Sequence, residues 1–205
     1  MKFTINILFW VFCFLNIVNA DTIHGKNDSI KSFVPNIKVI GHSWAVGTFK
    51  GKEDYFKKQG ILIDETSEVG TSLSWAYERL KEVPENKYDA LCILTGINDY
   101  KNDLGKVTKV FSNILELGVS KAPLIFVFNI GYYEPAVEMV TYMNDWLNEV
   151  AKLNPNLIIV IDVYSEIESK KKDGFKMSSN GLHPSSYDII QKLFVSVVKD
   201  YYSIK

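Results

Sequence analysis

The stretch at residues 37–44 reads Ile37-Lys38-Val39-Ile40-Gly41-His42-Ser43-Trp44. A run rich in β-branched residues ends at Gly41, a turn carries Ser43, and a helical pattern follows. In an open α/β sheet, ligands bind at the carboxyl ends of the strands, where the strand order reverses. Ser43 is therefore a candidate site residue, although without partners elsewhere in the chain a cap of the following helix would be the better interpretation.

The same alternation of strand and helix patterns continues along the chain. Apolar runs predict strands at 37–41, 61–64, 89–94, 123–130 and 157–163. Helical patterns cover about 44–58, 72–83, 104–117, 136–153 and, opening at Pro184, 184–202, whereas 165–183 reads as a polar loop. Strands that alternate with helices predict a three-layer, doubly wound α/β fold, flavodoxin-like, with about five parallel strands.

The chain of 205 residues divides into three predicted parts. Residues 1–20 have a basic start, an apolar run and small residues near Ala20, which is typical of a secretory signal peptide. An uncleaved N-terminal anchor is the alternative, although the apolar run is short for a membrane span. Residues 21–35 form a loose polar leader, and 36–205 form one domain. We therefore expect a secreted or periplasmic protein with no stable membrane span after processing.

Composition narrows the possible partners. The net charge is −1 and the charges are mixed along the chain, so no clustered basic face suggests nucleic acid. Beyond the signal peptide Cys92 is the single cysteine, so no intrachain disulfide is expected. No Ser/Thr/Gly-rich phosphate loop follows the first strand, and the three histidines lack metal-ligand spacing. We expect neither a cofactor nor a metal.

Usable chemical groups follow four of the predicted strands. Ser43 follows the first predicted strand, and Gly70 follows the second. Asn98 lies in the loop Gly96-Ile97-Asn98-Asp99 after the third strand, and His183 lies in the loop after the fifth. A hydroxyl nucleophile, hydrogen-bond donors for an oxyanion and an imidazole base are the groups that acyl transfer requires.

With these four residues in this order, the chain resembles the SGNH (GDSL-like) hydrolase family over essentially all of 37–202. The resemblance implies that Ser43 attacks an acyl carbonyl and that His183 acts as the base. It also implies an oxyanion hole formed by the N–H groups of Ser43 and Gly70 and the side-chain amide of Asn98.

The chain departs from the family pattern at two positions. Gly41-His42-Ser43 stands where the family has Gly-Asp-Ser, and Asn180 stands where the family has the triad Asp, three residues before His183. An Asn can orient the imidazole but brings no charge, so His183 should be a weaker base. Asp173 and Asp188 lack the family spacing. His42 is interpreted as a structural histidine, because adjacent residues at a strand end point to opposite sides.

Aromatic residues near the strand ends, Trp44, Tyr132 and Tyr133, could line an acyl or sugar pocket. The sequence thus favours a secreted serine esterase or acylhydrolase, slow because its triad acid is Asn180, with lipid acyl chains or acetylated sugars as substrates. The alternative is an inactive protein of the same fold that binds a glycan, lipid or protein.

Overall fold

The computed structural model describes residues 33–179 and 181–204. The predicted signal peptide, leader residues 21–32 and Asn180 lie outside the described residues. The strands are β1 (Asn36–Gly41), β2 (Leu62–Ser67), β3 (Ala90–Leu94), β4 (Ile125–Phe128) and β5 (Ile158–Ile161). The α-helices are α1 (Ser43–Phe49), α2 (Glu53–Lys58), α3 (Leu73–Lys81), α4 (Leu104–Lys121), α5 (Val137–Leu153), α6 (Val163–Lys172) and α7 (Asp188–Tyr202).

The five strands form one sheet in the order β2-β1-β3-β4-β5, with every neighbouring pair parallel. The fold class predicted from the sequence is therefore confirmed. The chain runs outward from β1 to β2 and then returns to β3 on the other side of β1. This reversal lies between β1 and β3, and it places the loops that carry Ser43 and Asn98 beside one another at the carboxyl edge of the sheet.

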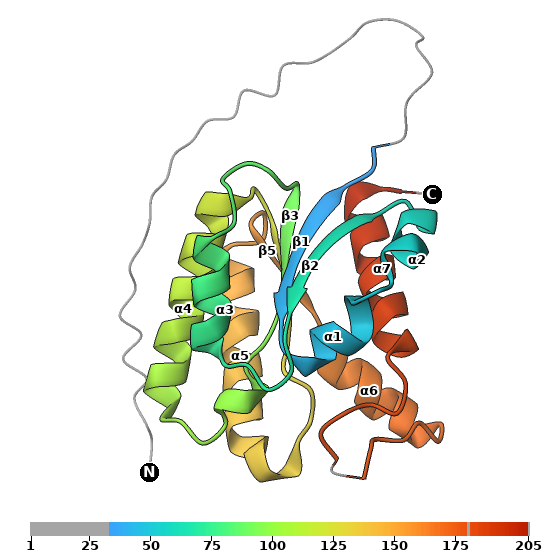
Figure 1. The fold of residues 1–205 in the computed structure, drawn as a ribbon. Helices are drawn as coiled ribbons and strands as arrows, with labels where there is room; N and C mark the ends of the chain where they lie inside the picture. Colours follow the sequence, from blue (N-terminus) through green and yellow to red (C-terminus); the bar gives the residue numbers. More distant parts are fainter. Residues whose placement is uncertain (1–32, 180, 205) are drawn as a thin grey trace, which may run out of the picture. The chain divides into compact units, whose positions relative to one another are not determined.

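Helices cover both faces of the sheet (Figure 1). Helices α3, α4 and α5 pack on one face against strand residues such as Ile40, Ile93 and Val127. Helices α1, α2, α6 and α7 pack on the other face against residues such as Val39, Cys92 and Phe128. Every residue of β3 and β4 is buried, which explains why these two strands read as continuous apolar runs.

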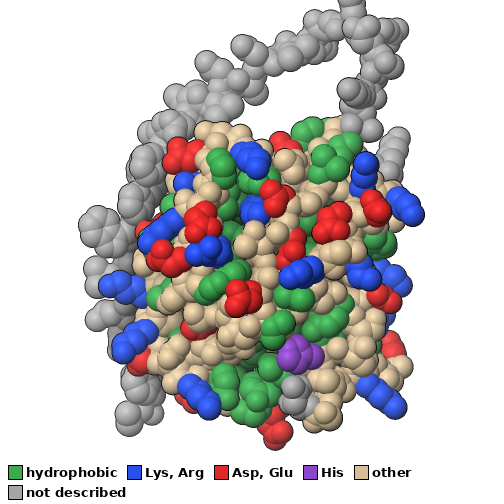
Figure 2. Space-filling view, in the orientation of Figure 1, with side chains coloured by type: hydrophobic (Ala, Val, Ile, Leu, Met, Phe, Trp, Pro, Cys, Tyr) green, Lys and Arg blue, Asp and Glu red, His purple; other side chains and the backbone are tan. Residues whose placement is uncertain are grey.

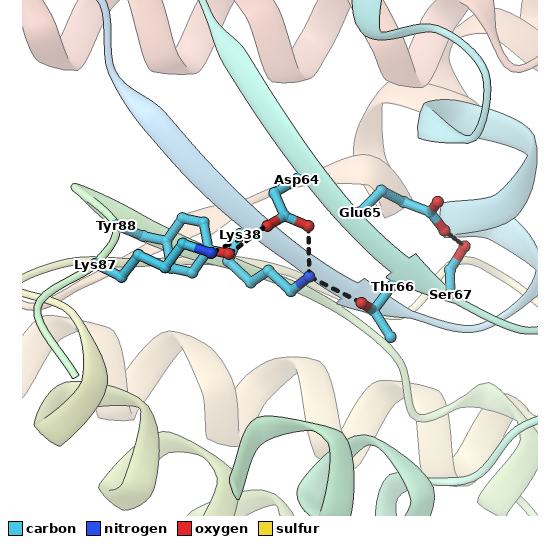
Figure 3. A network of polar contacts seen from close by, with 7 residues as sticks. All are labelled: Lys38, Asp64, Glu65, Thr66, Ser67, Lys87 and Tyr88. Atoms are coloured by element: carbon cyan, nitrogen blue, oxygen red, sulfur yellow. Dashed lines mark hydrogen bonds and ion pairs between the residues drawn. The ribbon is translucent and has the colours of Figure 1, made fainter. Parts of the chain in front are cut away.

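A polar network on one side of the β1–β2 pair supports the outer strand (Figure 3). The Lys38 ammonium on β1 donates to Asp64 Oδ1 at 2.7 Å and to Thr66 Oγ1 at 2.8 Å, both on β2. The Tyr88 hydroxyl, just before β3, donates to the same Asp64 carboxylate. These contacts span the register Lys38↔Asp64 and hold β2, and hence the loop that follows it, in a defined position.

Three elements differ from the sequence prediction. The helix expected over 44–58 is broken, because Lys50 is extended and Gly51 adopts a φ of +67° that ends α1. Helix α6 occupies part of the expected loop 165–183; only Val163 and Ile167 are buried along it, so its apolar pattern is weak. The last helix starts at Asp188 instead of Pro184, because Pro184 pairs with Met177 in a short antiparallel bridge.

Acidic and basic side chains are intermixed over the face of the molecule drawn in Figure 2. A search of the part of the chain that the structure describes finds no helix long and apolar enough to cross a membrane. Within the same residues, no group of three or more His, Cys, Asp or Glu side chains is arranged to hold a metal ion.

Candidate active site

Ser43 is the first residue of α1, immediately beyond the turn that follows β1. This turn needs glycine at position 41, because a Cβ there would lie 2.4 Å from the Leu94 carbonyl oxygen. The His42 N–H donates to that same carbonyl at 3.0 Å, which joins the ends of β1 and β3. The Ser43 hydroxyl is thus fixed at the reversal point of the sheet, with 8% of the residue exposed.

His183 lies against this serine. Its Nε2 atom is 2.9 Å from Ser43 Oγ, although 140 positions separate the two residues in the sequence. Figure 2 shows a histidine at the molecular surface, next to hydrophobic side chains. A nitrogen at this distance can accept the hydroxyl proton when the serine attacks. The structure therefore brings together the nucleophile and the base that the sequence predicts.

A short closed loop carries the imidazole. An antiparallel bridge between Met177 and Pro184 joins the two ends of this loop. Inside it, the Ser178 N–H donates to the His183 carbonyl at 2.7 Å, and the His183 N–H donates to Ser178 Oγ at 3.2 Å. These hydrogen bonds fix the backbone conformation of His183 relative to Ser178.

The site as described contains no triad carboxylate. Across residues 33–179 and 181–204, no Asp or Glu hydrogen-bonds to the His183 ring: Asp173 caps the end of α6 and Asp188 lies in the first turn of α7. Asn180, the residue predicted in the triad-acid position, lies outside the described residues. Burial lowers the pKa of His183 below its usual value, so the imidazole is neutral at pH 7 and able to accept a proton.

His42 is the N-cap of α1. Its Nδ1 accepts the Trp44 N–H at 3.2 Å, which requires the proton to be on Nε2, and only 3% of the residue is exposed. Burial, together with repulsion from His183, lowers the pKa of His42 to about 3. The residue in place of the family's Asp is therefore a neutral, buried helix cap, as the interpretation of a structural histidine proposes.

The loops after β2 and β3 come together beside Ser43. The Glu68 N–H donates to the Gly41 carbonyl at 3.1 Å, and the Asn98 side-chain amide donates to the Thr71 carbonyl at 2.8 Å. Gly70, between these anchor points, is exposed and has a φ of +79°. The Asn98 amide carries a second N–H, and the first N–H groups of a helix such as α1 have no intrahelical acceptor. The predicted oxyanion donors thus lie on loops that are hydrogen-bonded to one another.

Asp99 is a functional support that was not predicted from the sequence. The structure shows that this buried carboxylate accepts from the Leu73 N–H at 2.9 Å and from the Asn102 amide at 3.2 Å. It therefore ties the loop that carries Asn98 to the first residue of α3, while burial raises its pKa. An Asp directly after the predicted donor Asn98 is the sequence signal that could have indicated this support.

The three predicted pocket aromatics occupy different surroundings. Trp44 is 3% exposed and lines a cavity of about 10 Å³, which has room for about one water molecule. The Tyr132 ring lies 6.3 Å from Tyr164 on α6, whereas the Tyr133 ring lies 5.5 Å from Tyr100 near β3. Tyr132 and Tyr133 thus belong to two separate aromatic pairs, and both side chains are partly exposed.

Comparisons with known proteins give structural matches alone. No protein-family model and no curated protein matches the sequence. A lipolytic protein of the G-D-S-L family from Veillonella parvula superposes with a TM-score of 0.68 at 17% identity, over 79% of this chain and 97% of that one. A lipase/acylhydrolase from Enterococcus faecalis superposes with a TM-score of 0.65 at 20% sequence identity. The match covers 81% of this chain and 96% of that one.

A third structural match is an acetyltransferase. The catalytic domain of peptidoglycan O-acetyltransferase A from Streptococcus pneumoniae, solved with a methylsulfonyl adduct, gives a TM-score of 0.61 at 16% identity, over 82% of this chain and 92% of that one. At such identities the likeness concerns the fold. Together with the parallel 2-1-3-4-5 sheet, these matches show that the chain has the fold of the SGNH (GDSL-like) hydrolases.

Proposed function

We propose that this protein is a serine esterase or acylhydrolase that cleaves carboxylic esters through an acyl-enzyme on Ser43. The 2.9 Å contact between Ser43 Oγ and His183 Nε2, at the carboxyl edge of the sheet, is the observation that carries the proposal. The lipolytic proteins of the same fold support it.

The proposed reaction uses Ser43 and His183 twice. Ser43 Oγ attacks the acyl carbonyl while His183 Nε2 takes the hydroxyl proton. The resulting oxyanion accepts hydrogen bonds from the N–H groups of Ser43 and Gly70 and from the Asn98 amide. Collapse of this intermediate releases the alcohol, which takes the proton from His183. Water then attacks the acyl-enzyme with His183 again as base, and releases the acid and free Ser43.

The substrate and location are part of the proposal. Lipid acyl chains and acetylated sugars are the candidate ester groups, and Trp44, Tyr132 and Tyr133 are the proposed aromatic lining of the substrate pocket. The signal-like residues 1–20 support a secreted or periplasmic location. An inactive binding protein is the alternative, and the observation in its favour is that no carboxylate contacts His183 within the described residues.

Hydrolysis of p-nitrophenyl acetate and butyrate tests the proposal. We expect measurable turnover that Ser43→Ala abolishes and that Ser120→Ala, which removes an exposed hydroxyl on α4, leaves unchanged. Loss of the triad carboxylate costs about 10⁴ in a serine protease, so Asn180→Asp should raise kcat by about tenfold or more.

A sulfonyl fluoride gives a second readout, because it should label Ser43 in the parent protein and not in Ser43→Ala. Absence of turnover and labelling in the parent, with no rescue by Asn180→Asp, would support the binding protein instead.

A further inference from the structure

One side chain joins the two halves of the candidate active site. The Trp44 indole N–H donates to the Leu182 carbonyl at 3.0 Å, across 138 positions of sequence. Trp44 follows the nucleophile Ser43 directly, and Leu182 directly precedes His183. This hydrogen bond therefore ties the backbone beside the nucleophile to the backbone beside the base.

The indole is itself held in a fixed place. It is 3% exposed and packs against the backbone of Gly131, where an added Cβ would lie 2.1 Å from the indole Cη2 atom. The buried Asn144 side chain makes two hydrogen bonds to the backbone of the preceding residue, Ile130. It accepts from the Ile130 N–H at 2.7 Å and donates to the Ile130 carbonyl at 2.8 Å. Helix α5 thus fixes the segment that seats the indole.

Within the described residues, the His183 ring has no carboxylate to orient it, and the hydrogen bonds described inside its loop involve Ser178. In a serine triad the carboxylate holds the imidazole in the correct orientation. We propose that Trp44 is a positioning residue, whose bond to Leu182 holds the His183 loop so that the imidazole stays within reach of Ser43. The catalytic consequence rests on the proposed esterase function, whereas the contact between the two loops does not.

Trp44→Phe tests the proposal, because phenylalanine keeps an aromatic ring and removes the N–H donor. Trp146→Phe is the matched control: this indole packs against Phe111 on the opposite face of the sheet. Small misplacements of a catalytic group can cost about 10²-fold in rate, so we expect kcat of Trp44→Phe to fall by about tenfold or more while KM changes less than about twofold. Equal kcat values in Trp44→Phe and the parent would overturn the proposal.

A titration of His183 by NMR gives a readout independent of turnover. Burial lowers the pKa of this residue in the parent, so release of its loop in Trp44→Phe should move the pKa up towards its ordinary value. Trp146→Phe should leave the titration unchanged, and the signal is assigned with His183→Ala. If the parent shows no esterase activity, the proposed function fails, but this titration still decides whether Trp44 holds the loop.

Replacement of Trp44 with 3-benzothienyl-alanine covers the case in which Trp44→Phe does not fold. This analogue keeps the bicyclic shape and lacks the N–H. We expect it to shift the His183 titration as Trp44→Phe does. A parent-like titration in a folded protein carrying the analogue would refute the positioning role.

Discussion

The buried imidazole of His42 should make the protein markedly less stable in acid. Its pKa is about 3 in the folded chain and 6.5 in the unfolded chain, so between these values the unfolded state binds a proton that the folded state does not. Stability is therefore fully present above pH 6.5 and is lost as the pH falls towards 3. At 1.36 kcal/mol per pKa unit, the contribution of His42 to the free energy of unfolding should fall by about 2.5 kcal/mol between about pH 7 and pH 4.5.

Urea unfolding at a series of pH values measures this loss. His42→Asn is the matched variant, because Asn also caps helices well and does not titrate. The variant will be less stable overall where the ring leaves a gap, but its free energy of unfolding should fall by about 2.5 kcal/mol less than that of the parent over the same pH range. Every other titrating group is shared by the two proteins, so equal slopes in the parent and in His42→Asn would refute the reasoning.

Three further results are expected. The acidic limb of the pH profile of kcat/KM should lie below pH 6.5, because burial lowers the pKa of His183 and the base must be neutral; a limb at or above pH 7 in ester hydrolysis assays would contradict this. Asn98→Ala should lower kcat by about 10²–10³ through loss of an oxyanion donor, and an unchanged kcat in the same assay would exclude Asn98 from that role. Asp99→Ala should lower the free energy of unfolding by about 1–3 kcal/mol, because it leaves the Leu73 N–H without its acceptor; in urea titrations Asp99→Asn, which keeps an acceptor oxygen, should lose less.

Much of the fold could be predicted because the central strands are buried on both faces. The apolar runs around Cys92 in β3 and Phe126 in β4 are continuous, and the amphipathic pattern of α4 is strong. Helix α6 was not predicted from the sequence, because it buries just two side chains and therefore has a weak apolar pattern. Its capping residue Asp162 and the lysines of its last turn were the available signals, and local signals of this size are weaker than periodicity.

Within the site, the sequence supplied the candidate residues but not their supports. Ser43, Gly70, Asn98 and His183 could be placed on loops at one edge of the sheet, since parallel strands bring their carboxyl ends together. Three supporting hydrogen bonds could not be predicted: the capping bond of His42, the bond from the Leu73 N–H to Asp99, and the bond from the Trp44 indole to Leu182. Each depends on a particular orientation of a side chain between segments that are distant in the chain.

The sequence by itself determined the strand–helix alternation, the parallel sheet and the identity of the chemical groups at its edge. These follow from local periodicity and from the short connections that parallel strands allow. Tertiary structure alone decided that His183 lies 2.9 Å from Ser43 and that the Trp44 indole bridges to the His183 loop. Such contacts depend on close packing between elements up to 140 residues apart, and no local pattern of residues encodes a distance of that kind.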